Sequence, residues 1–177
     1  MNDFLTSWSP QTVMAAVVVA PLLIEAAISA RNDRRLRQAG AIEPAGDVYR
    51  AMALAYPGSF VAMLLEGFLR AGPADASFRA GLVLFVAAKA LKYWAIASLG
   101  SRWTFRVLVP PGSTRTVRGP YRWIAHPNYI AVAGELTGLA LAMHAGISGP
   151  VSLLSFGYLM IRRIRVEESA LRQGESA

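Results

Sequence analysis

The sequence predicts an all-α integral membrane protein with about five transmembrane helices. Of its 177 residues, 54% are hydrophobic and 16% are charged, whereas a soluble domain carries about 25% charged residues. The apolar residues also gather in long runs, and five spans of ~20 residues each would use nearly all of them. We expect one membrane domain over residues 1–177, because no internal repeat divides the chain.

The composition excludes several classes of protein. The chain has no cysteine, which removes disulfide scaffolds, thiolate nucleophiles and thiolate metal sites. Its two histidines, His126 and His144, are 18 residues apart on one expected helix, about 27 Å along its axis, so no metal site is expected. The net charge is +7, but the arginines flank apolar runs, which indicates membrane orientation and lipid contact rather than nucleic-acid binding.

The first 99 residues contain three expected spans. These spans cover residues 12–29, 49–69 and 77–99. No basic segment precedes the first span, so we expect a retained helix and not a cleaved signal peptide. Pro57 lies inside the second span, where proline is expected to kink a helix.

Residues 100–127 are too polar to span a membrane, and we expect a cytoplasmic loop there. Residues 104–109 alternate polar and apolar side chains, and the turn-forming sequence Pro-Pro-Gly-Ser separates them from residues 114–117. This pattern fits either a short hairpin on the membrane surface or an irregular loop. Residues 128–145 and 148–161 are the last two expected spans, a helical hairpin that continues as a charged helix to Arg172.

Positive charge sets the expected orientation, because cytoplasmic loops of membrane proteins are enriched in arginine and lysine. The three segments on one side of the five spans hold a single basic residue, Arg70. The segments on the other side hold the arginine clusters at residues 31–37, 102–122 and 162–172. We therefore expect the N-terminus outside, the C-terminus in the cytoplasm, and the protein in the cell (inner) membrane.

Five charged side chains lie inside the expected spans, where a charge usually faces a partner or a cavity because it is costly in hydrocarbon. They are Glu25, Glu66, Glu135, Lys89 and Lys92. Glu135 lies two helical turns beyond Asn128, so we expect it to line the same cavity as Tyr129. Lys92 lies near the cytoplasmic end of its span and is expected to snorkel to the interface. Glu25 and Glu66 are expected to pair within the bundle.

Two polar segments are placed to carry chemistry. Residues 118–129 put His126 and Pro127 where the fourth span begins. Proline disfavours helix at the preceding residue and suits the first helical turn, so His126 should lie at a helix N-terminus, a position that favours binding of an anion. Residues 162–168, Arg-Arg-Ile-Arg-Val-Glu-Glu, lie at the cytoplasmic end of the last helix. Taken alone, the first segment also fits interfacial anchors, and the second a solvated helix end.

Together, the two segments resemble the isoprenylcysteine carboxyl methyltransferase family of membrane enzymes. The family pattern is Gly-x-Tyr, then Arg-His-Pro-x-Tyr-x-Gly, a transmembrane helix pair, and Arg followed closely by Glu-Glu and Leu. Here it reads Gly119-Pro120-Tyr121, then Ala125-His126-Pro127-Asn128-Tyr129-Ile130-Ala131, and finally Arg165-Val166-Glu167-Glu168-Ser169-Ala170-Leu171. The C-terminal half is also similar to membrane phospholipid N-methyltransferases and, more remotely, to sterol reductases.

The resemblance implies an S-adenosylmethionine site at the cytoplasmic membrane face, with the histidine, proline and tyrosine at the methionine part of the cofactor. The implied cofactor-binding residues are Tyr121, His126, Pro127, Tyr129, Arg165, Glu167 and Glu168. Our candidate catalytic residues are Arg163, Glu135 and Arg122. Ala125 stands where the family has arginine, and Arg122 or Arg118 is the candidate replacement.

The function that the resemblance implies is methyl transfer to a lipophilic acceptor that reaches the site from the bilayer. A carboxylate acceptor needs positioning more than a base, whereas a phenol or a lipid amine would need one, with Glu135 or Glu167 as candidates. The alternatives are a nicotinamide-dependent membrane reductase and a non-catalytic scaffold of the same fold. We expect the last two helices to bring His126 and Glu167 to one cleft, with Tyr129 on its wall and Trp123 at its rim.

Overall fold

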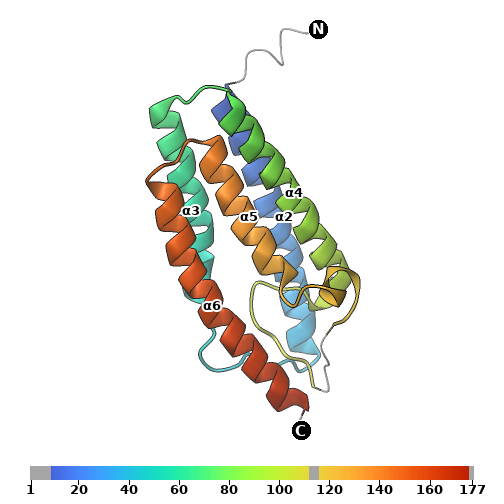
Figure 1. Ribbon diagram of the computed structural model, residues 1–177. Coiled ribbons are helices and arrows are strands. Elements are labelled where there is room, and N and C mark those ends of the chain that lie inside the picture. Colours follow the sequence, from blue (N-terminus) through green and yellow to red (C-terminus); the bar gives the residue numbers. More distant parts are fainter. Residues whose placement is uncertain (1–8, 112–115, 176–177) are drawn as a thin grey trace.

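The computed structural model is a bundle of antiparallel helices (Figure 1). It describes residues 9–111 and 116–175, with side chains up to Ser169. The helices are α2 (Pro10–Gln38), α3 (Tyr49–Arg70), α4 (Ala76–Leu99), α5 (Pro127–Ala142) and α6 (Ser148–Glu175). The described part of the long connection between α4 and α5 contains two short 3-10 helices, η1 (Gly100–Arg102) and η2 (Gly119–Arg122). This connection defines the loop end of the bundle, where α6 also ends (Figure 1).

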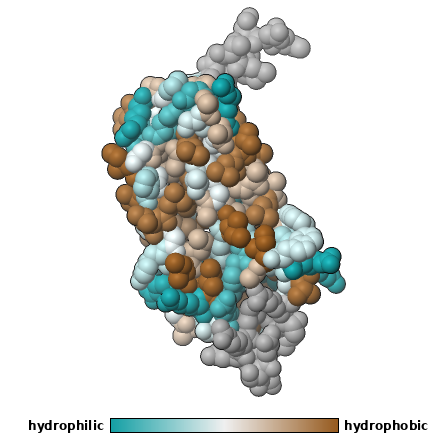
Figure 2. Space-filling view, in the orientation of Figure 1, coloured by the Kyte–Doolittle hydropathy of each residue, from teal (hydrophilic) through white to brown (hydrophobic). Residues whose placement is uncertain are grey.

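Among the described residues, three helices are long and apolar enough to cross a membrane, namely α2, α3 and α4 with its extension to Arg102. Large apolar side chains point outward from them, including Leu23, Leu54 and Val83, which are 65%, 77% and 69% exposed. Figure 2 shows hydrophobic side chains along the middle of the bundle and hydrophilic ones gathered toward its two ends. Because so much exposed apolar surface is suited to hydrocarbon and not to water, the protein is a membrane protein.

Helix α5 lies inside the bundle, which explains why it is shorter than the expected fourth span. It has 16 residues, fewer than the ~20 that cross a bilayer. It begins at Pro127, as proline at a first helical position favours, and ends at Ala142. Nine of its residues are buried among the other helices, so protein contacts replace much of the lipid contact that an outer helix needs.

Two glycines bring α4 and α5 into backbone contact. A Cβ atom added to Gly138 would lie 2.7 Å from the backbone nitrogen of Phe85 and 2.8 Å from the carbonyl oxygen of Gly81. Small residues allow such close approach between helices in membranes. The apolar core extends from this contact to Phe60 and Leu136.

Carboxylates fix helix ends on the side of the bundle opposite the loop end. Asp75 accepts the Phe78 N–H at 2.9 Å and caps α4. Glu66 accepts the backbone N–H of Ser148 at 2.7 Å, at the start of α6, and pairs with Arg70 at 2.9 Å. Glu66 therefore pairs as expected, but at the end of the bundle and not in its interior.

The described part of the 100–127 loop forms no hairpin, which favours the irregular-loop alternative. Val109 instead makes an isolated antiparallel bridge with Ile42 of the α2–α3 loop, through reciprocal hydrogen bonds of 3.0 and 3.1 Å. The backbone groups of Val109 are therefore already paired when the expected turn begins. Residues 112–115, which include the end of that turn and the start of its second arm, lie outside the described residues.

Candidate functional site

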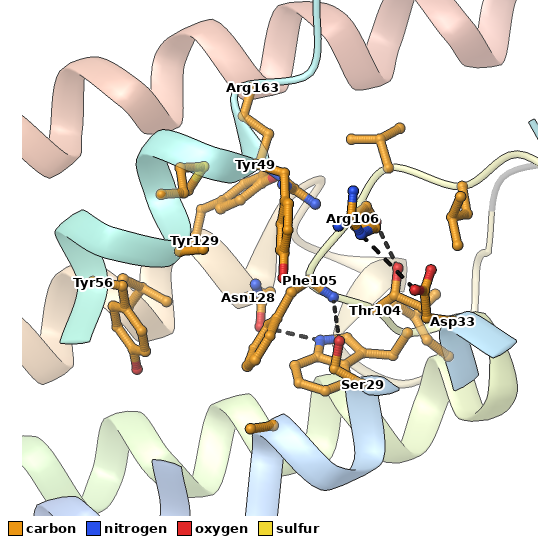
Figure 3. A pocket seen from close by; sticks show the side chains of 18 of the residues that line it. Ser29, Asp33, Tyr49, Tyr56, Thr104, Phe105, Arg106, Asn128, Tyr129 and Arg163 are labelled. Carbon is orange, nitrogen blue, oxygen red and sulfur yellow. Dashed lines mark hydrogen bonds and ion pairs between the residues drawn. The ribbon is translucent and has the colours of Figure 1, made fainter. Parts of the chain in front are cut away.

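A cavity of about 610 Å³ lies between α2, α3, α5, α6 and residues 103–109. Its wall at the loop end is polar and includes Tyr121, His126, Asn128, Tyr129, Arg163 and Glu167. Its wall between α2 and α3 is apolar and includes Leu22, Leu23, Ala26, Met52, Ala53 and Pro57. Figure 3 shows Tyr49 and Tyr129 at the cavity with Arg163 reaching in from α6. The cavity thus offers a polar compartment and an apolar one in a single space.

The two halves of the sequence motif meet in the polar compartment. The Tyr129 hydroxyl donates a hydrogen bond to Glu167 Oε2 at 2.9 Å, and His126 Nε2 lies 3.3 Å from Glu168 Oε1. His126 directly precedes α5 and lies at its N-terminus, as expected from its position before Pro127. Since His126 and Glu167 both line the cavity, the expectation that they face one cleft is confirmed. Trp123 is 69% exposed and packs against Trp94 outside that wall.

Arg163 extends the motif contacts to the α2–α3 loop. Its guanidinium is buried, and Nε donates to the Tyr129 hydroxyl at 3.1 Å. Its Nη1 lies 3.4 Å from Oδ1 of Asp47, whose side chain is only 4% exposed. Asp47 is a site residue that the sequence motif did not reveal, because no pattern in the loop marks it.

Tyr121 reaches the cavity through a turn that requires glycine. Gly119 has φ of +55°, and a Cβ atom there would collide with the Ser98 side chain of α4. Glycine alone tolerates both conditions, which accounts for the first position of the Gly-x-Tyr pattern. Burial, and after it the negative charge of Glu167, raises the pKa of Tyr121. The phenol therefore remains protonated and available as a hydrogen-bond donor.

Residues 103–109 form a cover over one side of the cavity, which all seven of them line. The cover is fastened to α2 by the Phe105 N–H, which donates to Ser29 Oγ at 2.8 Å. The Arg106 guanidinium lies 4.0 Å from the centre of the Tyr49 ring and pairs with Glu43 at 2.8 Å. Figure 3 shows Phe105 and Arg106 on this segment beside Tyr49 and Ser29. The cover is therefore held at several points and is not a free loop.

Glu135 lies outside the cavity lining, in a buried ionic cluster. The cluster contains the acids Glu25 and Glu135, the lysines Lys89 and Lys92, and Tyr56, drawn from α2, α3, α4 and α5. Each lysine contacts both acids at 2.7 to 3.4 Å. The Tyr56 hydroxyl donates to Glu135 and accepts from Lys92 at 2.8 Å.

The cluster corrects two expectations and confirms a third. Glu135 does not line the cavity that contains Tyr129, because the cluster holds its carboxylate. Lys92 does not snorkel, because two carboxylates and the Tyr56 hydroxyl hold its ammonium inside the bundle, where its side chain is 2% exposed. Glu25 pairs within the bundle, as expected. Of this group, only Lys92 and Tyr56 also line the cavity.

Three remaining motif residues stand apart from the cavity wall. Arg122 is exposed, with its guanidinium 5.4 Å from the ring of its neighbour Trp123. Arg165 is also exposed, on the side of α6 away from the buried Arg163. Pro127 is buried as the first residue of α5, so its part is to start the helix that carries Tyr129.

The fold and the cavity define a class of protein: helical membrane proteins whose last two helices join polar motif residues at one end of a largely apolar cavity. The chain belongs to the isoprenylcysteine carboxyl methyltransferase family, whose model matches residues 81–173. This region runs from α4 to α6 and contains both halves of the motif. Asp47 and most of the apolar wall lie before it.

Two bacterial relatives are similar to the chain over most of their length. The uncharacterized protein YpbQ of Bacillus subtilis (strain 168) is 26% identical over 161 residues, which cover 91% of this chain and 96% of the relative. An uncharacterized protein of Haemophilus influenzae is 25% identical over 157 residues, covering 88% of this chain and 91% of the relative. The comparison with solved structures gave no significant match.

Proposed function

We propose that this protein is an S-adenosylmethionine-dependent methyltransferase that methylates a lipophilic acceptor. The observation that carries the proposal is the junction of the two motif halves, through Tyr129 and Glu167, at the polar end of a cavity with an apolar far wall. The family membership supports the same reaction class. A polar cofactor and a lipid-like acceptor would then occupy adjoining compartments.

The polar compartment fits the cofactor chemically. Arg163 and His126 offer positive charge or N–H donors for the carboxylate of the amino-acid part. Glu167 and Glu168 offer acceptors for its ammonium group and its ribose hydroxyls. When bound there, S-adenosylmethionine would supply a methyl group made electrophilic by a positively charged sulfur.

The chain's own residues would contribute position, charge and exclusion of water. The Tyr129 hydroxyl holds Glu167 on one side and accepts from Arg163 on the other, which fixes the carboxylate before a ligand arrives. Such preorganised charge stabilises a positive ligand without reorganisation during the reaction. The cover at residues 103–109 encloses the space beside it, so the reactants are held together and not diluted by water.

The apolar compartment supports a lipophilic acceptor. Leu23 lines the cavity although it is 65% exposed on the outer surface, so the wall between α2 and α3 lies next to the lipid-facing side. An acceptor carboxylate is already a nucleophile and would need only placement. For a phenol or amine acceptor, Glu167 is the better candidate base, because the Glu135 carboxylate is held in the ionic cluster.

We also propose five membrane-crossing helices, with the N-terminus outside and the C-terminus in the cytoplasm of the cell (inner) membrane. The alternating helix directions support this arrangement, since the segments that follow α2 and α4 and the end of α6 share the loop end (Figure 1). These segments carry the arginine clusters, as expected for the cytoplasmic side. Cysteine accessibility labelling on each side of the membrane tests the orientation.

The decisive experiment is the substitution Glu167→Gln with calorimetry of S-adenosylhomocysteine binding to the purified protein in detergent. We expect binding more than tenfold weaker, with nearly unchanged thermal stability, because the half-exposed end of a helix contributes little to the fold. The control is Glu175→Gln, four residues beyond the motif, in which binding should equal that of the parent. Equal and negligible effects of both substitutions, or a parent that binds no cofactor, would refute the proposal.

A further inference from the structure

Asp47 is a buried carboxylate that connects parts of the molecule far apart in sequence. It lies in the short loop between α2 and α3, and its side chain is 4% exposed. Its Oδ1 accepts the Tyr49 N–H at 3.1 Å and lies 3.4 Å from Arg163 Nη1. Its Oδ2 accepts the Val107 N–H of the cover at 3.0 Å. One carboxylate thus holds a cover residue on one oxygen and a motif-region arginine on the other.

These contacts form a continuous polar path from the cover to the candidate cofactor site. Its members, in order, are Val107, Asp47, Arg163, Tyr129 and Glu167. Each link joins atoms 2.9 to 3.4 Å apart. Both ends line the same cavity, Val107 on the cover and Glu167 on α6.

The path depends on Asp47 because its neighbours have few ways to adjust. Arg163 is 6% exposed, and a buried guanidinium that loses its carboxylate partner must move toward another acceptor or toward water. Such a movement would break its hydrogen bond to Tyr129. Loss of the Asp47 carboxylate would also remove the acceptor of the Val107 N–H. A ligand at Glu167 that fixes the Tyr129–Arg163 contact would, by the same links, favour the fastened cover.

We propose that Asp47 is a positioning residue that couples occupancy of the candidate cofactor site to closure of the cover over the acceptor compartment. The inference rests on the proposed function, in that the occupant is S-adenosylmethionine or its product. Asp47 touches neither reactant in this account. It acts by holding Arg163 and the Val107 N–H in position at the same time, so that the acceptor compartment is enclosed when the cofactor is bound.

The test is hydrogen exchange of peptides that cover residues 103–109, measured with and without S-adenosylhomocysteine on the full-length protein in detergent. In the parent protein, the ligand should slow exchange of the cover. In Asp47→Asn, we expect ligand affinity about tenfold weaker, since a charge-assisted contact is lost. At saturating ligand, the cover of this variant should exchange as fast as without ligand. Parent-like protection and affinity in Asp47→Asn would overturn the proposal.

The matched control is Glu43→Gln, which loosens the cover by a different route. Glu43 pairs with Arg106 at 2.8 Å and with Arg37 at 2.7 Å. Exchange of the cover should rise in this variant, while ligand affinity and the protection caused by the ligand remain those of the parent. If Glu43→Gln abolished the protection as completely as Asp47→Asn, any weakening of the cover would suffice, and a specific role of Asp47 would be excluded.

A second arm needs no ligand and separates this inference from the proposed function. Arg163→Gln should speed exchange of residues 103–109 in the ligand-free protein, because Arg163 of α6 is linked to the cover through Asp47. The exposed neighbour substitution Arg162→Gln should leave that exchange unchanged. No response to Arg163→Gln would overturn the coupling. A parent that binds no S-adenosylhomocysteine but responds to Arg163→Gln would refute the cofactor assignment and keep the mechanical link.

Discussion

The buried ionic cluster makes a quantitative prediction about charge balance inside the bundle. The side chains of Glu25 and Glu135 are fully buried, and those of Lys89 and Lys92 are 9% and 2% exposed. Two positive and two negative charges therefore cancel in a space closed to water. Glu25→Gln would leave a net charge of +1 there and remove the two shortest ion pairs, both 2.7 Å.

The expected loss for Glu25→Gln is about 3–5 kcal/mol, the range found when one partner of a buried pair is removed. For a chain of this length, that corresponds to a Tm lowered by roughly 6–20 °C. The double variant Glu25→Gln with Lys89→Met restores neutrality, because Lys92 and Glu135 remain as a pair. We expect its loss to be about 0.5–3 kcal/mol smaller than the sum of the two single losses, the usual size of coupling between contacting residues.

The assay is thermal unfolding of the parent, both single variants and the double variant in one detergent, analysed as a double-mutant cycle. Recovery in the double variant would show that imbalance of charge, and not the loss of particular contacts, causes most of the destabilisation. Additive losses from Glu25→Gln and Lys89→Met would refute this reasoning.

Two further predictions concern packing and acid stability. Gly138→Ala should destabilise the bundle by about 1–3 kcal/mol through overpacking, because the added Cβ would lie 2.7 Å from the α4 backbone. Gly157→Ala should be neutral or slightly stabilising, because no atom lies within 4 Å of its added Cβ. Tm measurements of the two variants decide between these outcomes, and equal effects would contradict the packing argument. The pKa of Asp75 is lowered by the Phe78 N–H and, to a smaller extent, by His144. The stabilisation that the Asp75 carboxylate gives the folded protein is therefore present above the unfolded-state pKa of ~3.9. It is lost as the pH falls through the lower folded-state pKa. Asp75→Asn should therefore make Tm less dependent on pH in the acid range, and an unchanged pH profile would argue against this contribution.

The helices were predictable from the sequence because long apolar runs have few stable alternatives in a membrane. That His126 and Glu167 face one cavity was predictable for a similar reason, since a short turn between two helices forces the helices to lie antiparallel. Helix α3 continues through Pro57. Helix α2 continues to Gln38, beyond the expected end of its span at residue 29, and α5 ends at Ala142, three residues before the expected end. Interior helices such as α5 need not match the bilayer thickness, so hydropathy alone sets their ends poorly.

The polar contacts across the bundle were less predictable. Lys92 near the end of a span fits snorkelling as well as pairing, and only its closeness to Glu25 and Glu135 decides the question. Asp47 and Arg106 lie in loops without a recognisable motif, and their roles depend on which loops touch in space. Periodicity describes one element at a time and therefore does not contain this information.

The cluster also has a consequence for the order in which the protein is made. Glu25, Lys89 and Lys92 belong to α2 and α4, which leave the ribosome before α5. Until α5 arrives, this part of the nascent chain holds two positive charges and one negative charge. Glu135 supplies the missing negative charge on a helix that is short for an independent membrane span. We therefore expect α5 to pack into the bundle more readily once α2 and α4 are in place, because Glu135 brings the negative charge that their lysines lack.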